Sequence, residues 1–262
     1  HALATRRRQM ELDLRAALEN RQFEVHYQPQ VDLKSGEIGG FEALVRWRHP
    51  ERGLVPPGDF ISLSEEVGLI DRLGAFVLHT ACRDAISWPG SVKVAVNLSA
   101  IQFRSGRLVE LVEEALRQSG LEAHRLELEI TEGVMLMDTS GVLNQLRQLK
   151  RMGVHISLDD FGTGYSSLSY IRNFPFDKIK IDQSFVRELG SSADSLAIIR
   201  AVAGMCGSLG IATTAEGVEN DAQLEILSKE KCDSVQGWLF GKAMPIADTL
   251  GLFDRGPFAR AA

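Results

Sequence analysis

Short runs of β-branched and apolar residues alternate with longer amphipathic stretches along most of the chain. The short runs are typical of buried strands, and the longer stretches carry apolar residues at helical spacing. The candidate strands are residues 23–31, 38–47, 92–98, 126–130, 154–158, 178–181, 211–215 and 234–240. The candidate helices are residues 5–20, 70–87, 108–119, 142–152, 195–209 and 222–229. Eight strands that alternate with helices predict an α/β fold, a TIM-like (β/α)8 barrel in preference to an open doubly wound sheet.

The first two candidate strands are joined by a connection that is too short for a parallel crossover. Only residues 32–37 separate them, with Lys34, Ser35 and Gly36 at the turn. A crossover between parallel strands needs roughly a dozen residues or more. The two strands therefore form a hairpin, and we expect a barrel whose first strand is antiparallel to the others.

Composition and charge are those of a soluble globular domain. Hydrophobic residues make up 44% and charged residues 24% of the 262 residues, close to the average for such domains. The net charge of −6 argues against duplex nucleic acid as a partner, because that binding depends on a basic face. We expect residues 1–20 to form a connecting helix, residues 21–255 to form the barrel domain, and residues 256–262 to form a C-terminal tail.

The most apolar window of the chain covers residues 196–215 and is long enough to suggest a membrane span. Gly204, Gly207 and Gly210 interrupt this window. These glycines favour a helix that ends near Gly210 and is followed by a short strand. The chain begins at His1 and shows no signal peptide, so we expect a piece of a longer protein in which any membrane contact comes from upstream segments.

The three cysteines, Cys82, Cys206 and Cys232, lie far apart and show no C-x-x-C spacing. This pattern indicates buried or semi-buried thiols in a reducing compartment, in preference to disulfides or a zinc site. We therefore expect a cytoplasmic location, either of a whole protein or of the cytoplasmic part of a membrane-bound regulator.

Polar side chains stand at the ends of most candidate strands or, for Glu42, Arg46 and Gln236, inside them. They are Glu42 and Arg46, Asn97, Glu129, Asp159 and Asp160, Lys180, Glu216 and Gln236. In a barrel these carboxyl ends meet at one mouth, where the active site lies. Alternation within the strand around Ser157 turns Ile156 and Leu158 outward, which leaves His155, Ser157 and Asp159 facing the interior.

The carboxylates among these residues predict a metal site. If Glu42, Glu129, Asp159, Asp160 and Glu216 converge, their repulsion requires protons or cations. Their oxygens, with the neutral oxygen of Asn97, are hard ligands that suit Mg²⁺ or Mn²⁺ better than Zn²⁺ or copper. More carboxylates than one ion requires indicate two ions that share an aspartate, an arrangement used in phosphodiester hydrolysis. The alternative is that each acid caps the helix that follows its strand. Capping could explain one such residue, but it explains polar residues on six strands less well.

Two other patterns carry less weight. The glycine-containing segment 160–168 lacks the spacing and lysine of a phosphate-binding P-loop, and is interpreted as a mobile connection after a strand. The sequence Gly164-Tyr165-Ser166 is not a nucleophile elbow, because Leu168 stands where a glycine is required.

From about Leu12 to Phe253, the chain resembles the EAL domains, the bacterial cyclic di-GMP phosphodiesterase family. The motifs that carry the resemblance are Tyr27-Gln28-Pro29, Glu42-Ala43-Leu44-Val45-Arg46-Trp47, Asn97-Leu98-Ser99, Glu129-Ile130-Thr131-Glu132, Asp159-Asp160-Phe161-Gly162-Thr163-Gly164, Lys178-Ile179-Lys180-Ile181-Asp182, Ala215-Glu216-Gly217-Val218-Glu219 and Gln236-Gly237. The resemblance implies a barrel with an antiparallel first strand, and hydrolysis of cyclic di-GMP to linear pGpG with Mg²⁺ or Mn²⁺. Ca²⁺ is expected to bind the same oxygens without supporting turnover.

The resemblance also implies a role for each motif residue. The implied metal ligands are Glu42, Asn97, Glu129 and Asp159, with Asp160 serving a second ion. Lys180 would contact the attacking water or the phosphate, and Glu216 would be either the general base or a ligand of the second ion. The implied substrate groove contains Gln28, Leu44, Arg46 and Gln236. Glu132 and Glu219 would support the loop near residues 161–168, where the family forms a homodimer.

Two other functions stay open. The first is a receptor that binds cyclic di-GMP without cleaving it, with the site held inactive by a misplaced loop or a missing dimer. The second is a metal-dependent phosphodiesterase for another dinucleotide. The residues at the catalytic positions match the active pattern throughout, which favours the phosphodiesterase.

Overall fold

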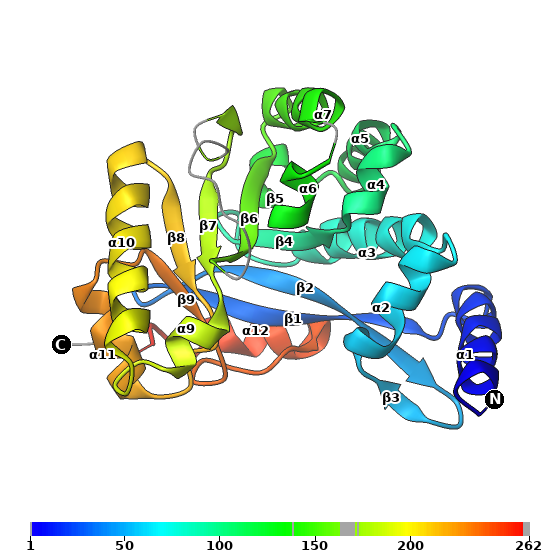
Figure 1. Ribbon diagram of the computed structural model, residues 1–262, viewed down its shortest axis with the longest axis horizontal. Helices are drawn as coiled ribbons and strands as arrows, with labels where there is room; N and C mark the ends of the chain where they lie inside the picture. The colour runs from blue at the N-terminus through cyan, green and yellow to red at the C-terminus, as the bar shows by residue number, and fades with distance from the viewer. Residues whose placement is uncertain (1, 138, 163–170, 172, 259–262) are drawn as a thin grey trace.

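The computed structural model describes residues 2–137, 139–162, 171 and 173–258. Eight strands close into a mixed barrel, with helices packed around its outside (Figure 1). The barrel strands are β1 (Phe23–Asp32), β2 (Ile38–His49), β4 (Lys93–Leu98), β5 (Leu126–Thr131), β6 (His155–Phe161), β7 (Lys178–Ile181), β8 (Ala212–Ala215) and β9 (Ser234–Gln236). The predicted fold class and all eight predicted strands are confirmed.

Strand β1 runs against the rest of the barrel, as the short first connection predicts. It pairs antiparallel with β2 on one side and with β9 on the other. The remaining neighbours, from β2 through β4 to β9, pair in parallel. The side chains at the carboxyl ends of these parallel strands are thus placed at one mouth of the barrel.

Two short strands were not predicted. Strand β3 (Gly53–Val55) pairs antiparallel with the end of β2, and β10 (Met244–Pro245) pairs antiparallel with β1. Both are too short to show a period of two in the sequence. Strand β9 ends at Gln236, earlier than predicted, because Gly237 leaves the sheet in a bend.

The helices of the predicted alternation are present with small changes of length. They are α3 (Ile70–Ala85), α5 (Leu108–Ser119), α7 (Thr139–Arg151), α10 (Ala193–Leu209) and α11 (Asp221–Lys229). Shorter helices form connections: α4 (Ala100–Arg104), η1 (Ala123–Arg125), α6 (Glu132–Met135) and α9 (Gln183–Arg187). Helix α12 (Ile246–Phe253) follows β10. Helix α10 ends where Gly210 adopts φ of 70°, which a glycine reaches without steric cost. None of the helices in the described part of the chain combines the length and apolarity needed to cross a bilayer.

A side lobe packs beside the barrel at the end away from α10 (Figure 1). It contains α1 (Ala2–Glu19), α2 (Pro57–Glu66) and β3. The side lobe has a hydrophobic core of its own. Leu14 and Ala17 of α1 are fully buried in this core, together with Trp47 at the end of β2 and Phe60 of α2. Helix α1, expected to be a connector, is therefore packed against the extension of the strand that carries Glu42.

Outward and inward faces of the barrel strands differ sharply in chemistry. Ile156 and Leu158 are buried in the main core under the helices, whereas Ser157 and Asp159 face the interior, as alternation predicts. The three cysteines are free and buried, and burial raises the pKa of each thiol to about 12. Their expected state as unpaired, buried thiols is confirmed.

Candidate active site

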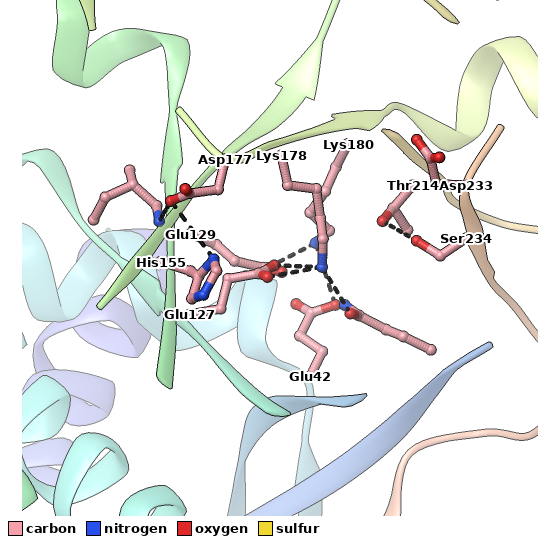
Figure 2. Close-up of polar contacts among 12 residues, drawn as sticks. Glu42, Glu127, Glu129, His155, Asp177, Lys178, Lys180, Thr214, Asp233 and Ser234 are labelled. Atoms are coloured by element: carbon pink, nitrogen blue, oxygen red, sulfur yellow. Dashed lines mark hydrogen bonds and ion pairs between the residues drawn. The ribbon is translucent and has the colours of Figure 1, made fainter. Parts of the chain in front are cut away.

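Lys180 lies at the centre of the barrel mouth and is fully buried (Figure 2). Its Nζ atom forms ion pairs with Glu129 Oε2 and Glu216 Oε1, each at 2.7 Å. The carboxylates of Asp159 and Glu42 lie 3.2 and 3.4 Å from the same nitrogen. Four acids from different strands, which the sequence analysis expected to converge, therefore surround one ammonium group.

Glu42 is the most completely hydrogen-bonded of these acids. Asn97 Nδ2 donates to Glu42 Oε1 at 2.7 Å, and Gln236 Nε2 donates to Glu42 Oε2 at 2.6 Å. Burial alone would raise the pKa of Glu42, but Lys180 and these two donors outweigh it and hold the pKa below its ordinary value. Glu42 is therefore ionised.

Glu129 has a different environment. Burial, together with the neighbouring acids, raises the pKa of Glu129 well above its ordinary value, and the charge of Lys180 offsets only part of this. Among the described residues, Glu129 Oε1 has no hydrogen-bond partner although it is buried. A buried carboxylate oxygen without a partner is costly unless something binds to it.

Two of these acids, Asp159 and Glu216, also meet Asp160 at one corner of the site. One carboxylate oxygen each of Asp159, Asp160 and Glu216 lie within 4.8 Å of one another. Burial raises the pKa of Glu216 to about 8, despite its ion pair with Lys180. Burial and the charge of Asp159 also raise the pKa of Asp160. A divalent cation would relieve this crowding of negative charge.

The backbone at Asp160 is bent out of the strand. Asp160 has φ of 56°, in the left-handed region that aspartate tolerates better than most residues. Its N–H donates to Asp159 Oδ1 at 3.0 Å, and the pairing of β6 with β7 shifts register between Leu158 and Phe161. This bend lets two adjacent aspartates face the same corner, which regular alternation would forbid.

A cavity of about 220 Å³ opens beside the acids. It is lined by Gln28, Glu42, Leu44, Gln183, Arg187, Glu216, Gly217, Glu219, Gln236, Gly237 and Trp238. Three of the four residues expected in the substrate groove, all except Arg46, are in this lining. The Arg46 guanidinium donates to Val45 O at 2.9 Å and forms no ion pair within the described residues.

Sequence reasoning missed three residues that line this cavity: Gln183, Arg187 and Trp238. Helix α9, which carries the first two, is too short to show a helical period. Trp238 is 63% exposed, and Lys242 Nζ lies 4.8 Å from the centre of its ring. The position of Trp238 directly after Gln236-Gly237 could have indicated that it lies near the site. Its exposure, however, depends on how the chain leaves β9.

Two glycines allow close packing after β8 and β9: Gly237 against Val218, and Gly217 against Gln183 at the start of α9. A Cβ atom on Gly237 would lie 2.1 Å from Val218 O, and one on Gly217 would lie 2.6 Å from Gln183 Cβ. Val218 N–H donates to Gln236 O at 3.1 Å. This close backbone approach places Gln236 next to the strand end that carries Glu216.

The two residues expected to support the loop lie in different places. Glu132 Oε1 accepts a hydrogen bond from the Gly162 N–H at 3.1 Å, at the start of that loop. Glu219 lies in the cavity wall, and its backbone N–H donates to Gln223 Oε1. Residues 163–168 of the loop, and with them most of the expected dimer contact, lie outside the described residues.

Comparison with known proteins gives a consistent picture. Residues 11–243 match the model of the EAL domain family. The chain is 46% identical over 242 residues to the bifunctional diguanylate cyclase/cyclic di-GMP phosphodiesterase MucR of Pseudomonas aeruginosa, covering 91% of this chain and 35% of MucR. It is 44% identical over 248 residues to the cyclic di-GMP phosphodiesterase NbdA of the same organism, covering 93% of this chain and 32% of NbdA.

Solved structures agree with the sequence relatives. The PaMucR phosphodiesterase in complex with c-di-GMP superposes with a TM-score of 0.88 at 45% identity, covering 92% of this chain and 99% of that one. The chain spans only about a third of the length of the curated relatives MucR and NbdA. Family model, relatives and fold lead to one conclusion: the chain belongs to the EAL domain family.

Proposed function

We propose that this chain hydrolyses one phosphodiester bond of cyclic di-GMP to give linear pGpG, and so lowers the level of this second messenger. The observation that carries the proposal is the meeting of four carboxylates within 3.4 Å of Lys180 Nζ at the barrel mouth. The similarity to a phosphodiesterase solved with c-di-GMP supports the choice of substrate.

The donor set fits divalent cations that prefer oxygen. The unpartnered Glu129 Oε1 and the corner formed by Asp159, Asp160 and Glu216 offer several carboxylate oxygens and no sulfur or imidazole. Such ligands suit Mg²⁺ or Mn²⁺. We infer two ions: Glu42, Asn97, Glu129 and Asp159 would hold the first, and Asp159, Asp160 and Glu216 would hold the second. Bound divalent ions supply Lewis-acid polarisation of the scissile phosphate.

Lys180 serves this reaction as a hydrogen-bond donor. Burial alone would lower its pKa, but the charges of Glu129, Glu216 and the other acids outweigh it and raise the pKa well above the ordinary value. These carboxylates therefore keep the Lys180 ammonium group protonated in the metal-free site. Its ammonium group is suited to hold the attacking water or the developing charge on the phosphate.

The cavity beside the acids is suited to the guanosine part of the substrate. Gln28, Leu44 and Gln236 line this cavity. Arg46, which forms no ion pair among the described residues, is available to pair with a phosphate. Trp238 also lines the cavity and is exposed, so a base can stack on the ring face that Lys242 does not cover.

Replacing Trp238 with alanine is expected to raise KM for cyclic di-GMP about tenfold and to leave kcat within about twofold, because stacking of a base on an aromatic ring contributes about 1–3 kcal/mol. Trp238→Phe, which keeps a ring, is the matched control and should retain most of the affinity. Steady-state kinetics with both variants provide the measurement. An unchanged KM in Trp238→Ala would remove this residue from the substrate site.

Further expectations concern the surroundings of the domain. We propose a homodimer formed near residues 161–168, with Glu132 bracing the loop and Glu219 supporting it from the cavity side. We also propose that residues 1–20 connect the catalytic domain, residues 21–255, to the upstream part of a longer cytoplasmic or membrane-anchored protein, with residues 256–262 as a tail. Light scattering of the purified chain at several concentrations tests the dimer.

The direct test of the function is incubation of the chain with cyclic di-GMP and Mn²⁺ or Mg²⁺, followed by chromatography of the nucleotides. Linear pGpG is expected with either ion, no product is expected after chelation with EDTA, and Ca²⁺ is expected to bind without turnover. Stable binding of intact cyclic di-GMP in the presence of each metal would instead identify a receptor. Faster cleavage of another dinucleotide in competition would replace the proposed substrate.

A further inference from the structure

A chain of side-chain hydrogen bonds leads from Glu42 down into the barrel. Gln236 Nε2 donates to Glu42 Oε2 at 2.6 Å, and Gln30 Nε2 donates to Gln236 Oε1 at 3.0 Å. Gln30 and Gln236 are register partners on β1 and β9, and both are buried. Gln30 neither contacts an acid of the mouth nor lines the cavity, so the function described above does not account for it.

The lower end of this chain is a second lysine–glutamate pair. Lys178 Nζ lies 2.8 Å from the Glu127 carboxylate and donates to Gln30 Oε1 at 3.4 Å. Lys178 and Glu127 stand two residues before Lys180 and Glu129 on β7 and β5, so the two pairs form successive levels of the barrel interior (Figure 2). The ion pair with buried Glu127 holds the Lys178 ammonium group beside Gln30.

The two ends of the chain determine how both amides are turned. An ammonium group can only donate hydrogen bonds, and an ionised carboxylate can only accept them. Reversing the amide of Gln236 would place its oxygen against the carboxylate of Glu42. Reversing the amide of Gln30 would place its NH₂ group against the ammonium of Lys178. Either reversal leaves buried polar groups unsatisfied, so only one arrangement satisfies both ends.

Neighbouring groups reinforce this arrangement. The second hydrogen of Gln236 Nε2 is donated to Gln28 Oε1 at 3.1 Å, and Gln28 Nε2 donates to Gly241 O at 3.2 Å. A Cβ atom on Gly40 would lie 3.1 Å from Lys93 O, so the glycine allows the backbone of β4 to approach β2 closely. With both its hydrogens and its oxygen engaged, the Gln236 amide holds Glu42 in one orientation.

We propose that Gln30 is a positioning residue: by donating to Gln236 Oε1 it directs the NH₂ group of Gln236 to Glu42 and so keeps Glu42 oriented for cation binding. This inference rests on the proposed function, in which Glu42 is a ligand of a divalent ion. Residues that orient a metal ligand through hydrogen bonds typically change metal affinity or activity by about 10- to 100-fold when they are replaced.

The test is a double-mutant cycle with Gln30→Met, Gln236→Met and the double variant. Mn²⁺ affinity is measured by calorimetry without nucleotide, and kcat and KM are measured with cyclic di-GMP. Gln30→Met is expected to weaken Mn²⁺ binding about 10- to 100-fold and to lower kcat with little change in KM. Because Gln30 acts through Gln236, its replacement is expected to cost nothing more in the Gln236→Met background.

The control variant is Thr214→Val. Thr214 is fully buried in the same barrel interior, but its hydroxyl pairs with Ser234 at 2.6 Å, outside the amide chain (Figure 2). It is expected to bind Mn²⁺ as the unchanged chain does. Gln30→Leu replaces Gln30→Met if thermal melting shows that the latter does not fold.

Three outcomes would overturn the inference: unchanged Mn²⁺ affinity in Gln30→Met, equal weakening in Thr214→Val, or additive losses in the double variant. A chain that binds Mn²⁺ but yields no pGpG would contradict the proposed function, whereas the comparison of Mn²⁺ affinities would still decide the role of Gln30. A chain that binds no Mn²⁺ would overturn both.

Discussion

Replacing Glu42 with alanine is expected to lower kcat for cyclic di-GMP hydrolysis by about 1000-fold or more, because divalent ions supply several kcal/mol of transition-state stabilisation and Glu42 is a proposed ligand. Mn²⁺ affinity, measured by calorimetry, is expected to fall with it. The fold should survive, since Lys180 retains ion pairs with Glu129, Glu216 and Asp159.

Arg46→Ala is the matched comparison, because Arg46 lies on the same strand but forms no ion pair in the described part of the chain. Its replacement is expected to raise KM about tenfold, since a bidentate contact with phosphate would be lost, and to leave Mn²⁺ affinity unchanged. Equal loss of Mn²⁺ affinity in the two variants would contradict the assignment of Glu42 to the metal and Arg46 to the phosphate.

Lys180→Met is expected to have the second largest effect, a fall in kcat of about 100- to 1000-fold, the usual consequence of removing a donor that faces developing charge. Without added metal, the variant should also lose about 3 kcal/mol of the free energy of unfolding, because removing one partner of a buried ion pair leaves uncompensated charge. Here four carboxylates lose their shared cation at once.

A divalent ion can replace the lost positive charge. Mn²⁺ is therefore expected to raise the melting temperature of Lys180→Met by more than it raises that of the unchanged chain, since binding to the folded state alone stabilises it. Lys150→Met serves as the control, because Lys150 pairs with Asp177, away from the acids of the mouth, and its response to Mn²⁺ should be normal. A smaller Mn²⁺-induced increase in Lys180→Met than in the unchanged chain would show that Lys180 does not balance the charge of the metal ligands.

Much of the barrel and its polar mouth could be predicted because alternation along a strand is a local property. The position of Glu129 between Leu128 and Ile130 is enough to turn it inward once those neighbours face the core. The hairpin after β1 follows equally directly from the length of its connection. These features depend on residues that are neighbours in sequence. The convergence of the acids at one end of the strands could be predicted for the same reason.

The rest depends on contacts between distant segments. The exposure of Trp238 follows from the close approach of Gly237 to Val218, and the turn of Asp160 follows from a register shift between β6 and β7. The burial of Leu14 in the side lobe requires α1 to meet the end of β2. Periodicity along the sequence does not predict contacts between distant segments. The additional residues that line the cavity and the packing of α1 were therefore found only in the structure.

The central claim is that side chains from separate strands hold divalent cations at the barrel mouth. Crystals grown with Mn²⁺ and without nucleotide test it through anomalous scattering at the manganese edge. We predict two peaks. The first should lie within coordination distance of Glu42, Glu129 and Asp159. The second should lie within coordination distance of Asp159, Asp160 and Glu216. The claim would be contradicted if the manganese peaks lay elsewhere on the chain and no ion were bound among these acids, where Lys180 would then remain the positive charge.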